Sequence, residues 1–388
     1  MKPPIDRKIS VCHVLNRFDI GGMENGVVNI CNRLDRSRFN PIICCLNALG
    51  PMAKRLHPSI QVYCMDYSKG FKLRDVIDLA LFFKRSKVNI VHTHAWGGGS
   101  LYGILAAKLA RIPIVINGEH GSFFTKPHQK IAQRIIYSLC DAHLSVSESL
   151  KNRVNTVIGL PLSRIKVIRN GVDTEKFNGN YPKNEIIERL HSEGYELDLQ
   201  SFHAIVIGSL KPEKAPMTLL YTLKRLLMNS PSMKLKVLFI GDGPDREKMS
   251  NFIKTEGLND AAFLLGNRTD VPEFLGLADV LVSTSIAQHE GLSNVMLESM
   301  SSGVPVLATR SVGAAELIND GVNGFLVDPN DVTMLAKRLK QLYQDTELLR
   351  SLGENARTLI LDQYSIEHML QGYEKLYVDL IHEKDRVI

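Results

Sequence analysis

The sequence predicts an α/β protein with two doubly wound parallel-sheet domains. Short apolar runs, typical of buried parallel strands, alternate with stretches of helical period along most of the 388 residues. This length exceeds what a single ordinary core supports. A polar stretch at about residues 178–200 interrupts the alternation, which then restarts. We therefore expect an N-terminal domain over residues 1–178 and a C-terminal domain over residues 200–364.

In the first domain, apolar runs predict strands, and the segments between them predict crossover helices. The strands are expected at residues 8–15, 41–46, 90–92 and 114–116. The helices are expected at residues 24–34, 73–84 and 101–110. Parallel strands need such crossover connections, so this order of strands and helices favours a parallel sheet.

The second domain repeats the pattern and is followed by a helical region. Strands are expected at residues 204–208, 236–240, 278–283 and 304–308, and helices at residues 217–228, 246–255 and 294–301. Helical period then continues through residues 331–344, 346–361 and 366–382. Ligands of doubly wound sheets bind outside the carboxyl ends of the strands, so residues that directly follow a strand are the candidate site residues.

Composition limits the class of protein. A hydrophobic content of 44% and a charged content of 23% are typical of globular proteins. The sequence has no run of about 18 apolar residues and no apolar N-terminal segment. We therefore expect neither a membrane span nor a secretory signal, and a cytoplasmic location.

Charge is distributed unevenly. Residues 1–180 contain 26 Lys and Arg against 12 Asp and Glu, a net +14, whereas the remainder contains 21 against 29, a net −8. A basic half favours an anionic partner surface, and we favour the inner leaflet of a membrane, bound peripherally. The alternative is a solvated basic face without a partner. Nucleic acid is disfavoured, because no binding motif is present and aromatic residues make up only 7% of the chain.

Two glutamates eight positions apart are the most informative feature. Glu290 lies after the strand expected at 278–283, and Glu298 lies about one turn inside the helix expected at 294–301. The backbone between them opens that helix and suits an anion; its residues are Gly291, Leu292, Ser293 and Asn294. Carboxylates accept hydrogen bonds from hydroxyls, so the segment predicts a nucleotide-sugar site. A hydrolytic carboxylate pair is the less favoured alternative.

Two further segments each follow a strand and open a helix. Gly22 belongs to a glycine pair after the first strand, where the backbone can approach a phosphate closely. Lys214 follows the strand at 204–208 and stands where a helix begins, so its charge can reach a diphosphate. An ordinary turn and an ordinary surface lysine are the alternative interpretations.

Three histidines raise the question of a metal site. They are His92, His94 and His120. His92 and His94 lie on the same side of an extended segment, but no acidic partner lies at ligand spacing, and the chain has no Asp-x-Asp motif, so we expect no metal. His120 follows the strand at 114–116 and suits a hydrogen bond to a sugar. An ordinary core or surface histidine is the alternative.

The segment from Glu290 to Glu298 resembles the signature of the retaining glycosyltransferases of family 4, also called group 1 glycosyl transferases. Other motifs resemble those of the family and occur in the same order along nearly the whole chain. They lie at residues 21–24, 167–173, 212–214, 239–244 and 303–306. The segments Gly-Glu-His-Gly at 118–121 and Gly-Gly-Met-Glu-Asn-Gly at 21–26 resemble sugar transferases associated with exopolysaccharide synthesis.

The resemblance implies a GT-B fold, in which two Rossmann-like domains face each other. A C-terminal helix, here residues 365–388, would cross back to the first domain. The implied activity is transfer of a sugar from a nucleoside-diphosphate sugar, such as a UDP-sugar, to a hydroxyl of a glycan or lipid-linked acceptor. The anomeric configuration would be retained, without a metal or any cofactor beyond the donor.

The resemblance also implies a role for each candidate residue. Glu298 would accept hydrogen bonds from ribose hydroxyls, and Glu290 would face the hydroxyls of the donor sugar. Lys214 would bind the diphosphate. Gly22 would let its loop close over the diphosphate, and His120 would approach the transferred sugar. The backbone of Gly291, Leu292, Ser293 and Asn294 would contact sugar and phosphate.

One position departs from the family pattern. The family usually has an arginine, a second phosphate ligand, where this chain has Ser209. A hydroxyl cannot replace the charge of a guanidinium. Three alternatives therefore stay open beside the transferase: a GT-B nucleotide-sugar epimerase, a glycoside hydrolase and a nucleotide-sugar-binding protein without catalysis.

Overall fold

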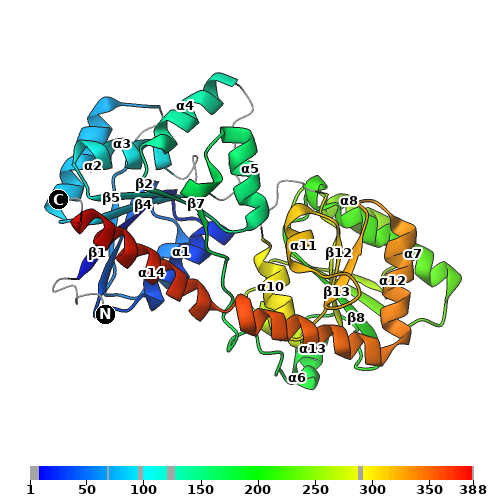
Figure 1. Cartoon of the computed structure of the whole chain (residues 1–388). Helices are drawn as coiled ribbons and strands as arrows, with labels where there is room; N and C mark the ends of the chain where they lie inside the picture. Colours follow the sequence, from blue (N-terminus) through cyan, green and yellow to red (C-terminus); the bar gives the residue numbers. More distant parts are fainter. Residues whose placement is uncertain (1–7, 68–69, 95–98, 120–126, 287–291, 387–388) are drawn as a thin grey trace. The chain divides into compact units, whose positions relative to one another are not determined.

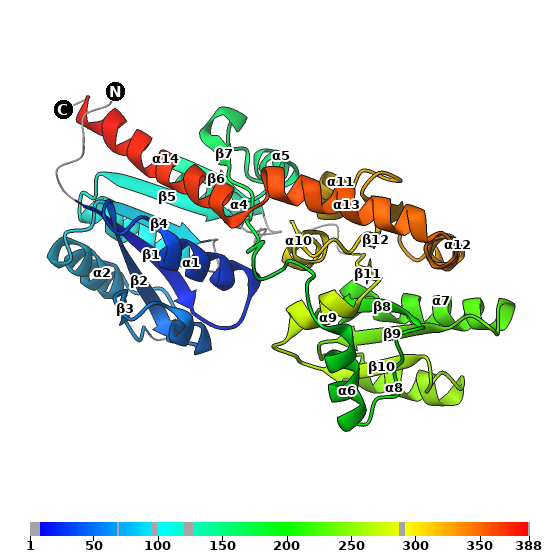
Figure 2. The same cartoon turned by 90° about the horizontal axis from the view of Figure 1, so that it is seen from below.

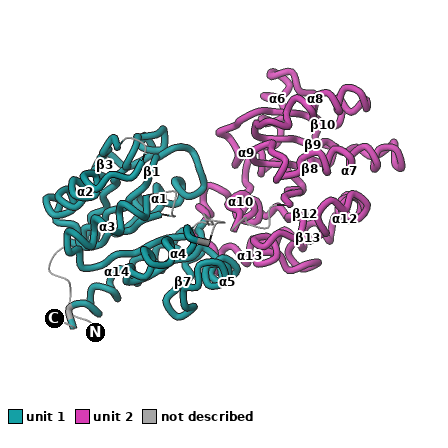
Figure 3. Tube along the Cα trace, turned by 90° about the horizontal axis from the view of Figure 1, so that it is seen from above, with its two compact units in different colours: residues 1–171, 366–388 teal, residues 172–365 magenta. Residues whose placement is uncertain are grey.

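The computed structural model describes residues 8–67, 70–94, 99–119, 127–286 and 292–386. The chain divides into two compact units (Figure 3). Unit 1 comprises residues 1–171 and 366–388, and unit 2 comprises residues 172–365. The polar stretch at 178–200 contains a helix, α6 (Lys183–Ser192). Its buried side chains belong to the core of unit 2, so this stretch packs as part of that unit.

Unit 1 contains a seven-stranded parallel sheet in the order β3-β2-β1-β4-β5-β6-β7. The strands are β1 (Ile9–Arg17), β2 (Phe39–Ala48), β3 (Gln61–Cys64), β4 (Ile90–His94), β5 (Ile114–Glu119), β6 (Ala142–Ser145) and β7 (Ile165–Val167). The first helices are α1 (Gly22–Arg33), α2 (Leu73–Arg85), α3 (Leu101–Leu109), α4 (Pro127–Ser138) and α5 (Glu148–Ile158). The strand order reverses between β1 and β4, which is where ligands bind in doubly wound sheets.

Helices cover both faces of this sheet (Figure 1). On one face, α2, α3, α4 and α5 bury their apolar sides against alternate strand residues such as Cys12 and Val14. On the other face, α1 and α14 (Ile366–Asp385) pack on the residues between, such as Val11. Figure 2 shows α14 beside α1 on that face. The expected return of the C-terminal helix to the first domain is confirmed.

Unit 2 contains a six-stranded parallel sheet in the order β10-β9-β8-β11-β12-β13. The strands are β8 (Phe202–Ile207), β9 (Leu235–Ile240), β10 (Ala262–Gly266), β11 (Val280–Ser283), β12 (Val306–Thr309) and β13 (Gly324–Val327). The helices after α6 are α7 (Pro216–Asn229), α8 (Arg246–Thr255), α9 (Val271–Leu277), α10 (Asn294–Ser301), α11 (Val312–Leu317), α12 (Val332–Gln344) and α13 (Thr346–Gln363). Here the strand order reverses between β8 and β11.

The predicted α/β class with two Rossmann-like parallel sheets is confirmed. Each sheet has a single reversal of strand order, so each unit has one expected binding crevice. Within the described part of the chain, no helix is both long and apolar enough to cross a bilayer.

Candidate functional site

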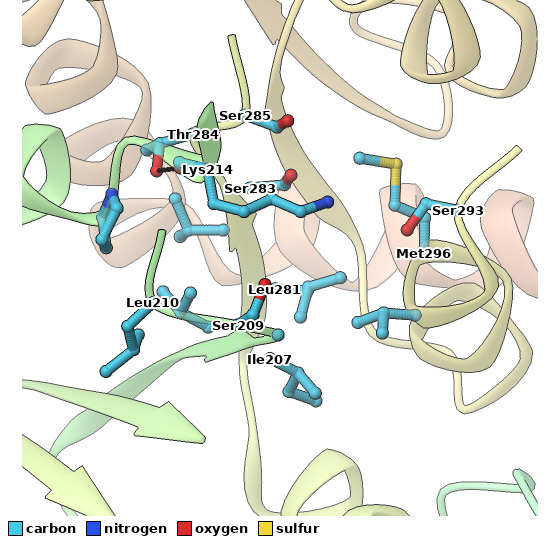
Figure 4. Close-up of a pocket in the computed structure, with 15 residues that line it drawn as sticks. Ile207, Ser209, Leu210, Lys214, Leu281, Ser283, Thr284, Ser285, Ser293 and Met296 are labelled. Carbon is cyan, nitrogen blue, oxygen red and sulfur yellow. Dashed lines mark hydrogen bonds between the residues drawn. The ribbon is translucent and has the colours of Figure 1, made fainter. Parts of the chain in front are cut away.

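A pocket lies at the reversal point of unit 2, between the carboxyl ends of β8 and β11 (Figure 4). Its polar side chains come from three segments: the turn after β8, the end of β11 and the start of α10. They are Ser209, Lys214, Ser283, Thr284, Ser285 and Ser293. Apolar side chains such as Leu281 and Met296 complete the wall. An apolar wall with a few hydroxyls and one cation suits a polar, anionic small molecule.

Lys214 ends a short 3₁₀ turn, Pro212–Lys214, that leads into α7. Its side chain extends toward the start of α10 in Figure 4. The hydroxyl of Thr284, at the end of β11, lies 2.9 Å from the main-chain oxygen of Lys214 and 3.0 Å from that of Ala215. The main-chain N–H of Ile286 donates to the oxygen of Glu213 over 3.0 Å. Backbone and hydroxyl contacts from the residues that follow β11 therefore fix the turn that carries the lysine.

Ser209 lies on the pocket wall, directly after the end of β8. The backbone there is held by the neighbouring turn after β9. Leu210 donates its N–H to the oxygen of Asp242 over 3.0 Å. Gly241 has a φ of +132° and lies so close to Gly208 that a side chain at position 241 would collide with the Gly208 oxygen. This packing keeps the Ser209 backbone in place at the pocket.

The start of α10 forms the opposite side of the pocket. Ser293 occupies the N-cap position in extended conformation, and its side chain makes no capping hydrogen bond. The first N–H groups of a helix lack intrahelical acceptors, and the helix dipole adds partial positive charge there. Leu292 is buried, and Asn294 is the first helical residue. This end of α10 therefore presents donors to an anion in the pocket.

Glu298 lies in the second turn of α10 and is half-buried. Burial raises the pKa of its carboxyl from the ordinary 4.5 to about 7, although the positive charge of Lys176 opposes the rise. A carboxyl in this environment accepts hydrogen bonds strongly once ionised, because few water molecules compete for it.

The structure brings Ser209, Lys214 and Ser293 together around one pocket and puts Leu292, Asn294 and Glu298 on the adjoining segment. Glu290, Gly291 and His120 lie outside the described residues. Gly22 opens α1 at the carboxyl end of β1 in unit 1. Sequence patterns did not identify Thr284 or Lys176 as site residues, because their contacts join segments that are far apart along the chain.

Three buried histidines meet at the reversal point of unit 1. His13 on β1 pairs in register with His92 on β4, and their ring nitrogens lie within 4.8 Å of each other and of those of His94. The Nδ1 of His13 and the Nε2 of His94 are 2.9 Å apart. Burial lowers the pKa of His13 to about 3, so its ring is neutral. His13 was absent from the sequence prediction, since only the strand register brings it to the other two.

Two family models match the chain in succession. The model of Glycosyltransferase Family 4 matches residues 20–176, and the model of the glycosyl transferases group 1 matches residues 189–359. The second match includes every residue of the pocket. The chain belongs to the group 1 glycosyl transferases. The resemblance inferred from Glu290 and Glu298 is thereby confirmed, and the protein is a glycosyltransferase.

This group 1 glycosyl transferase has curated relatives that match it over most of their length. It is 27% identical to UDP-Gal:alpha-D-GlcNAc-diphosphoundecaprenol alpha-1,3-galactosyltransferase of Escherichia coli, covering 97% of this chain and 98% of that protein. It is 28% identical to N-acetyl-alpha-D-glucosaminyl L-malate synthase of Bacillus anthracis, covering 79% of this chain and 80% of that protein.

Solved structures share the fold of this glycosyltransferase. A glycosyltransferase from Rickettsia africae matches with a TM-score of 0.85 at 20% identity, over 96% of this chain and 99% of that chain. HepE from Anabaena, solved in complex with UDP, matches with a TM-score of 0.81 at 20% identity, over 96% of this chain and 100% of that chain. The GT-B fold expected from the resemblance is confirmed.

Proposed function

We propose that this glycosyltransferase transfers a hexose from a UDP-sugar to a hydroxyl of a lipid-linked glycan, with retention at the anomeric carbon and without a metal or other cofactor. The reaction would serve exopolysaccharide or cell-surface glycan synthesis at the cytoplasmic face of a membrane. The observation that carries the proposal is the pocket between β8 and β11, where Lys214 extends toward the start of α10.

The chemistry of the pocket supports a nucleoside-diphosphate donor. A diphosphate needs cationic and N–H donors, which Lys214 and the start of α10 supply. A ribose needs acceptors for its hydroxyls, and Glu298 is the carboxylate on the adjoining helix. Glu290 would accept from hydroxyls of the transferred sugar, as its motif implies.

The comparisons support the choice of donor and acceptor. The Escherichia coli relative acts, by its name, with UDP-Gal on a GlcNAc-diphosphoundecaprenol, which is a lipid-linked sugar. HepE is solved with UDP and with UDP-glucose. Other relatives are named for lipopolysaccharide core and capsular polysaccharide synthesis.

The difficult step is departure of the diphosphate, on which negative charge accumulates. Lys214 and the N–H groups at the start of α10 would stabilise that charge, and a well-placed donor of this kind contributes about 3–4 kcal/mol. The bond from the anomeric carbon to the phosphate oxygen breaks, and the acceptor oxygen bonds to the same carbon on the same face. The acceptor proton passes to the departing phosphate. No protein nucleophile is needed.

Metal independence follows from the same account, because protein donors neutralise the diphosphate. In the described residues, one group of side chains has the composition and spacing of a metal site: His13, His92 and His94. Two of these rings bond to each other, and His92 bonds through Nδ1 to the Tyr377 hydroxyl over 2.9 Å. The three histidines lie in unit 1, and none of them is among the described residues that line the proposed donor pocket of unit 2.

The test is a product assay after dialysis against EDTA, with a panel of UDP-sugars and a polyprenyl-diphosphate-linked GlcNAc acceptor. We expect a disaccharide whose new linkage keeps the donor's anomeric configuration in the NMR spectrum. An inverted linkage, or activity that returns only when a divalent cation is added, would refute that part of the proposal.

The same assay separates the alternative functions. An epimerase would convert the donor sugar without acceptor. A glycoside hydrolase would release free sugar from glycans without nucleotide. A binding protein without catalysis would retain the donor unchanged at every acceptor concentration.

A further inference from the structure

Two helices of unit 1 carry exposed apolar stripes. On α2, the side chains of Leu73, Ile77 and Leu81 are 66%, 44% and 44% exposed and repeat every four residues. On α4, Ile131 and Ile135 are 61% and 59% exposed at the same spacing. Positions four apart lie on one side of a helix, so each helix presents a continuous apolar edge to the outside.

The two stripes belong to one layer of helices. Helix α3 packs against α2 on one side and against α4 on the other, and all three cover the face of the sheet opposite α14 (Figure 1). Leu109, near the end of α3, is 52% exposed. We call the exposed side of this layer the outer helix surface. It is defined by Leu73, Ile77, Leu81, Leu109, Ile131 and Ile135.

The same layer is strongly basic. Segments 71–87, 101–111 and 127–140 together contain nine Lys and Arg against two Asp, and α4 contains no acidic residue. One of the two aspartates, Asp75, is buried. The other, Asp78, forms an ion pair with Arg74 over 3.7 Å. Of the nine cations, Lys108 forms an ion pair over 3.6 Å with Asp141, which follows the third segment. The other charges still leave the outer helix surface with a net positive charge beside its large apolar side chains.

We propose that the outer helix surface docks on an anionic lipid bilayer. Leucine and isoleucine side chains gain free energy on entering the acyl boundary, and neighbouring Lys and Arg are attracted by anionic headgroups. A second copy of the chain fits less well. A symmetric dimer would bring the same basic surface against itself, which like charges oppose.

Unit 2 shows that this arrangement is local. Its exposed large apolar side chains are spread over several helices and loops, for example Leu199, Met228, Val312 and Leu361. Scattered apolar side chains of this kind are ordinary on protein surfaces, whereas stripes that repeat every four residues on two helices of one layer point to an interaction site. Docking depends on these surface residues and not on the sugar-transfer chemistry, so it goes beyond the proposed function.

Vesicle flotation of the full chain tests the proposal, with phosphatidylcholine alone and with one third phosphatidylglycerol. We expect binding to the anionic vesicles only. In Lys84→Gln with Arg85→Gln, we expect partitioning to fall about fivefold per charge, because each basic residue contributes about 1 kcal/mol. In Ile77→Gln with Leu81→Gln, we expect a loss of about tenfold or more. Met228→Gln with Leu361→Gln, in unit 2, is the matched control and should bind as the parent protein does.

Three results would overturn the proposal. The first is no binding to anionic vesicles, and the second is equal binding to neutral ones. The third is a parent protein that elutes as a dimer in gel filtration while the variant Ile77→Gln with Leu81→Gln elutes as a monomer. The apolar stripe on α2 would then be an interface between two copies of the chain. A thermal shift with UDP-sugars on the same proteins keeps the two proposals apart. If the protein binds a donor but not vesicles, the docking proposal is wrong and the proposed function stands. If it binds vesicles but no donor, the proposed function is wrong and the docking proposal stands.

Discussion

The hydroxyl of Thr284 joins the end of β11 to the turn that carries Lys214: its oxygen lies 2.9 Å from the main-chain oxygen of that lysine. The same hydroxyl reaches the main-chain oxygen of Ala215 over 3.0 Å. Thr284 is buried, so no water replaces it easily. The lysine proposed to bind the diphosphate is therefore positioned by a side chain that directly follows β11 and also lines the pocket.

Replacing Thr284 tests this positioning. Thr284→Val keeps the shape of the side chain but removes the donor, which leaves two main-chain oxygens without that hydrogen bond. We expect unfolding free energy to fall by about 1–3 kcal/mol. The ratio kcat/KM should fall by more than the loss of folded protein explains. Thr284→Ser keeps the hydroxyl and should retain most of both. Equal kinetics in the Val and Ser variants would show that the bond does not position Lys214.

Glu298→Gln should stabilise the protein at high pH. The pKa of Glu298 in the folded chain is about 7, above the ordinary 4.5. The folded state therefore keeps the carboxyl proton of Glu298 to a higher pH than the unfolded state does. The free energy of unfolding falls as pH rises from about 4.5 to about 7. The loss, complete above about pH 7, is up to about 3 kcal/mol. Chemical denaturation should show the variant more stable than the parent at pH 8 and similar at pH 4.5. Glu188→Gln, at an exposed position of α6, is the control for removing a glutamate charge.

The same substitution should weaken donor binding. An ionised carboxylate accepts stronger hydrogen bonds from ribose hydroxyls than an amide does, so we expect a loss of about 1–3 kcal/mol. Calorimetric titration at pH 8 measures it. A variant that is more stable yet binds the donor less tightly would show that burial of Glu298 serves function at the expense of stability. An unchanged donor Kd would refute the ribose role.

Ser209→Arg should strengthen donor binding. The family usually has an arginine at this position, and Ser209 lies on the pocket wall. A guanidinium that reaches the diphosphate contributes about 1.5–3 kcal/mol as a charged hydrogen bond. Ser209→Gln has similar reach without charge and is the control. If donor Kd is equal in the two variants, this position does not approach the diphosphate.

Ala215→Gly should stabilise the fold. Ala215 has a φ of +43° and a ψ of +49°, the left-handed conformation that costs a residue with a Cβ about 1–2 kcal/mol. Glycine avoids this cost but loses more conformational entropy on folding, so we expect a net gain of about 0.5–1 kcal/mol. Thermal unfolding measures the change. The control is Ala132→Gly, on an exposed position of α4, which should instead destabilise the protein.

Local signals in the sequence were sufficient for much of the fold. The expected helices at 246–255 and 294–301 coincide with α8 and α10, because each has a helical period between two apolar strand-like runs. The helix over residues 183–192 was missed, since its polar surroundings hide three buried apolar positions. Lys214 was correctly expected at the start of a helix, from the strand, turn and proline that precede it.

Features that depend on contacts between distant segments could not be predicted. The meeting of His13 with His92 depends on the register of β1 against β4. The bond from Thr284 to Lys214 joins residues 70 positions apart. The raised pKa of Glu298 depends on burial within the packed unit, which no spacing along the chain reveals.

Donor binding is the most direct test of the central claim that the pocket between β8 and β11 holds a nucleotide-sugar. Thermal shift would be measured with UDP-, GDP-, ADP- and TDP-sugars in the presence of EDTA, where a ligand at 100 times its Kd stabilises the protein by about 2.7 kcal/mol. We predict that a UDP-sugar raises Tm and that Lys214→Ala, folded as the parent is, loses the shift. An equal shift in Lys214→Ala, or no shift with any donor, would contradict the account.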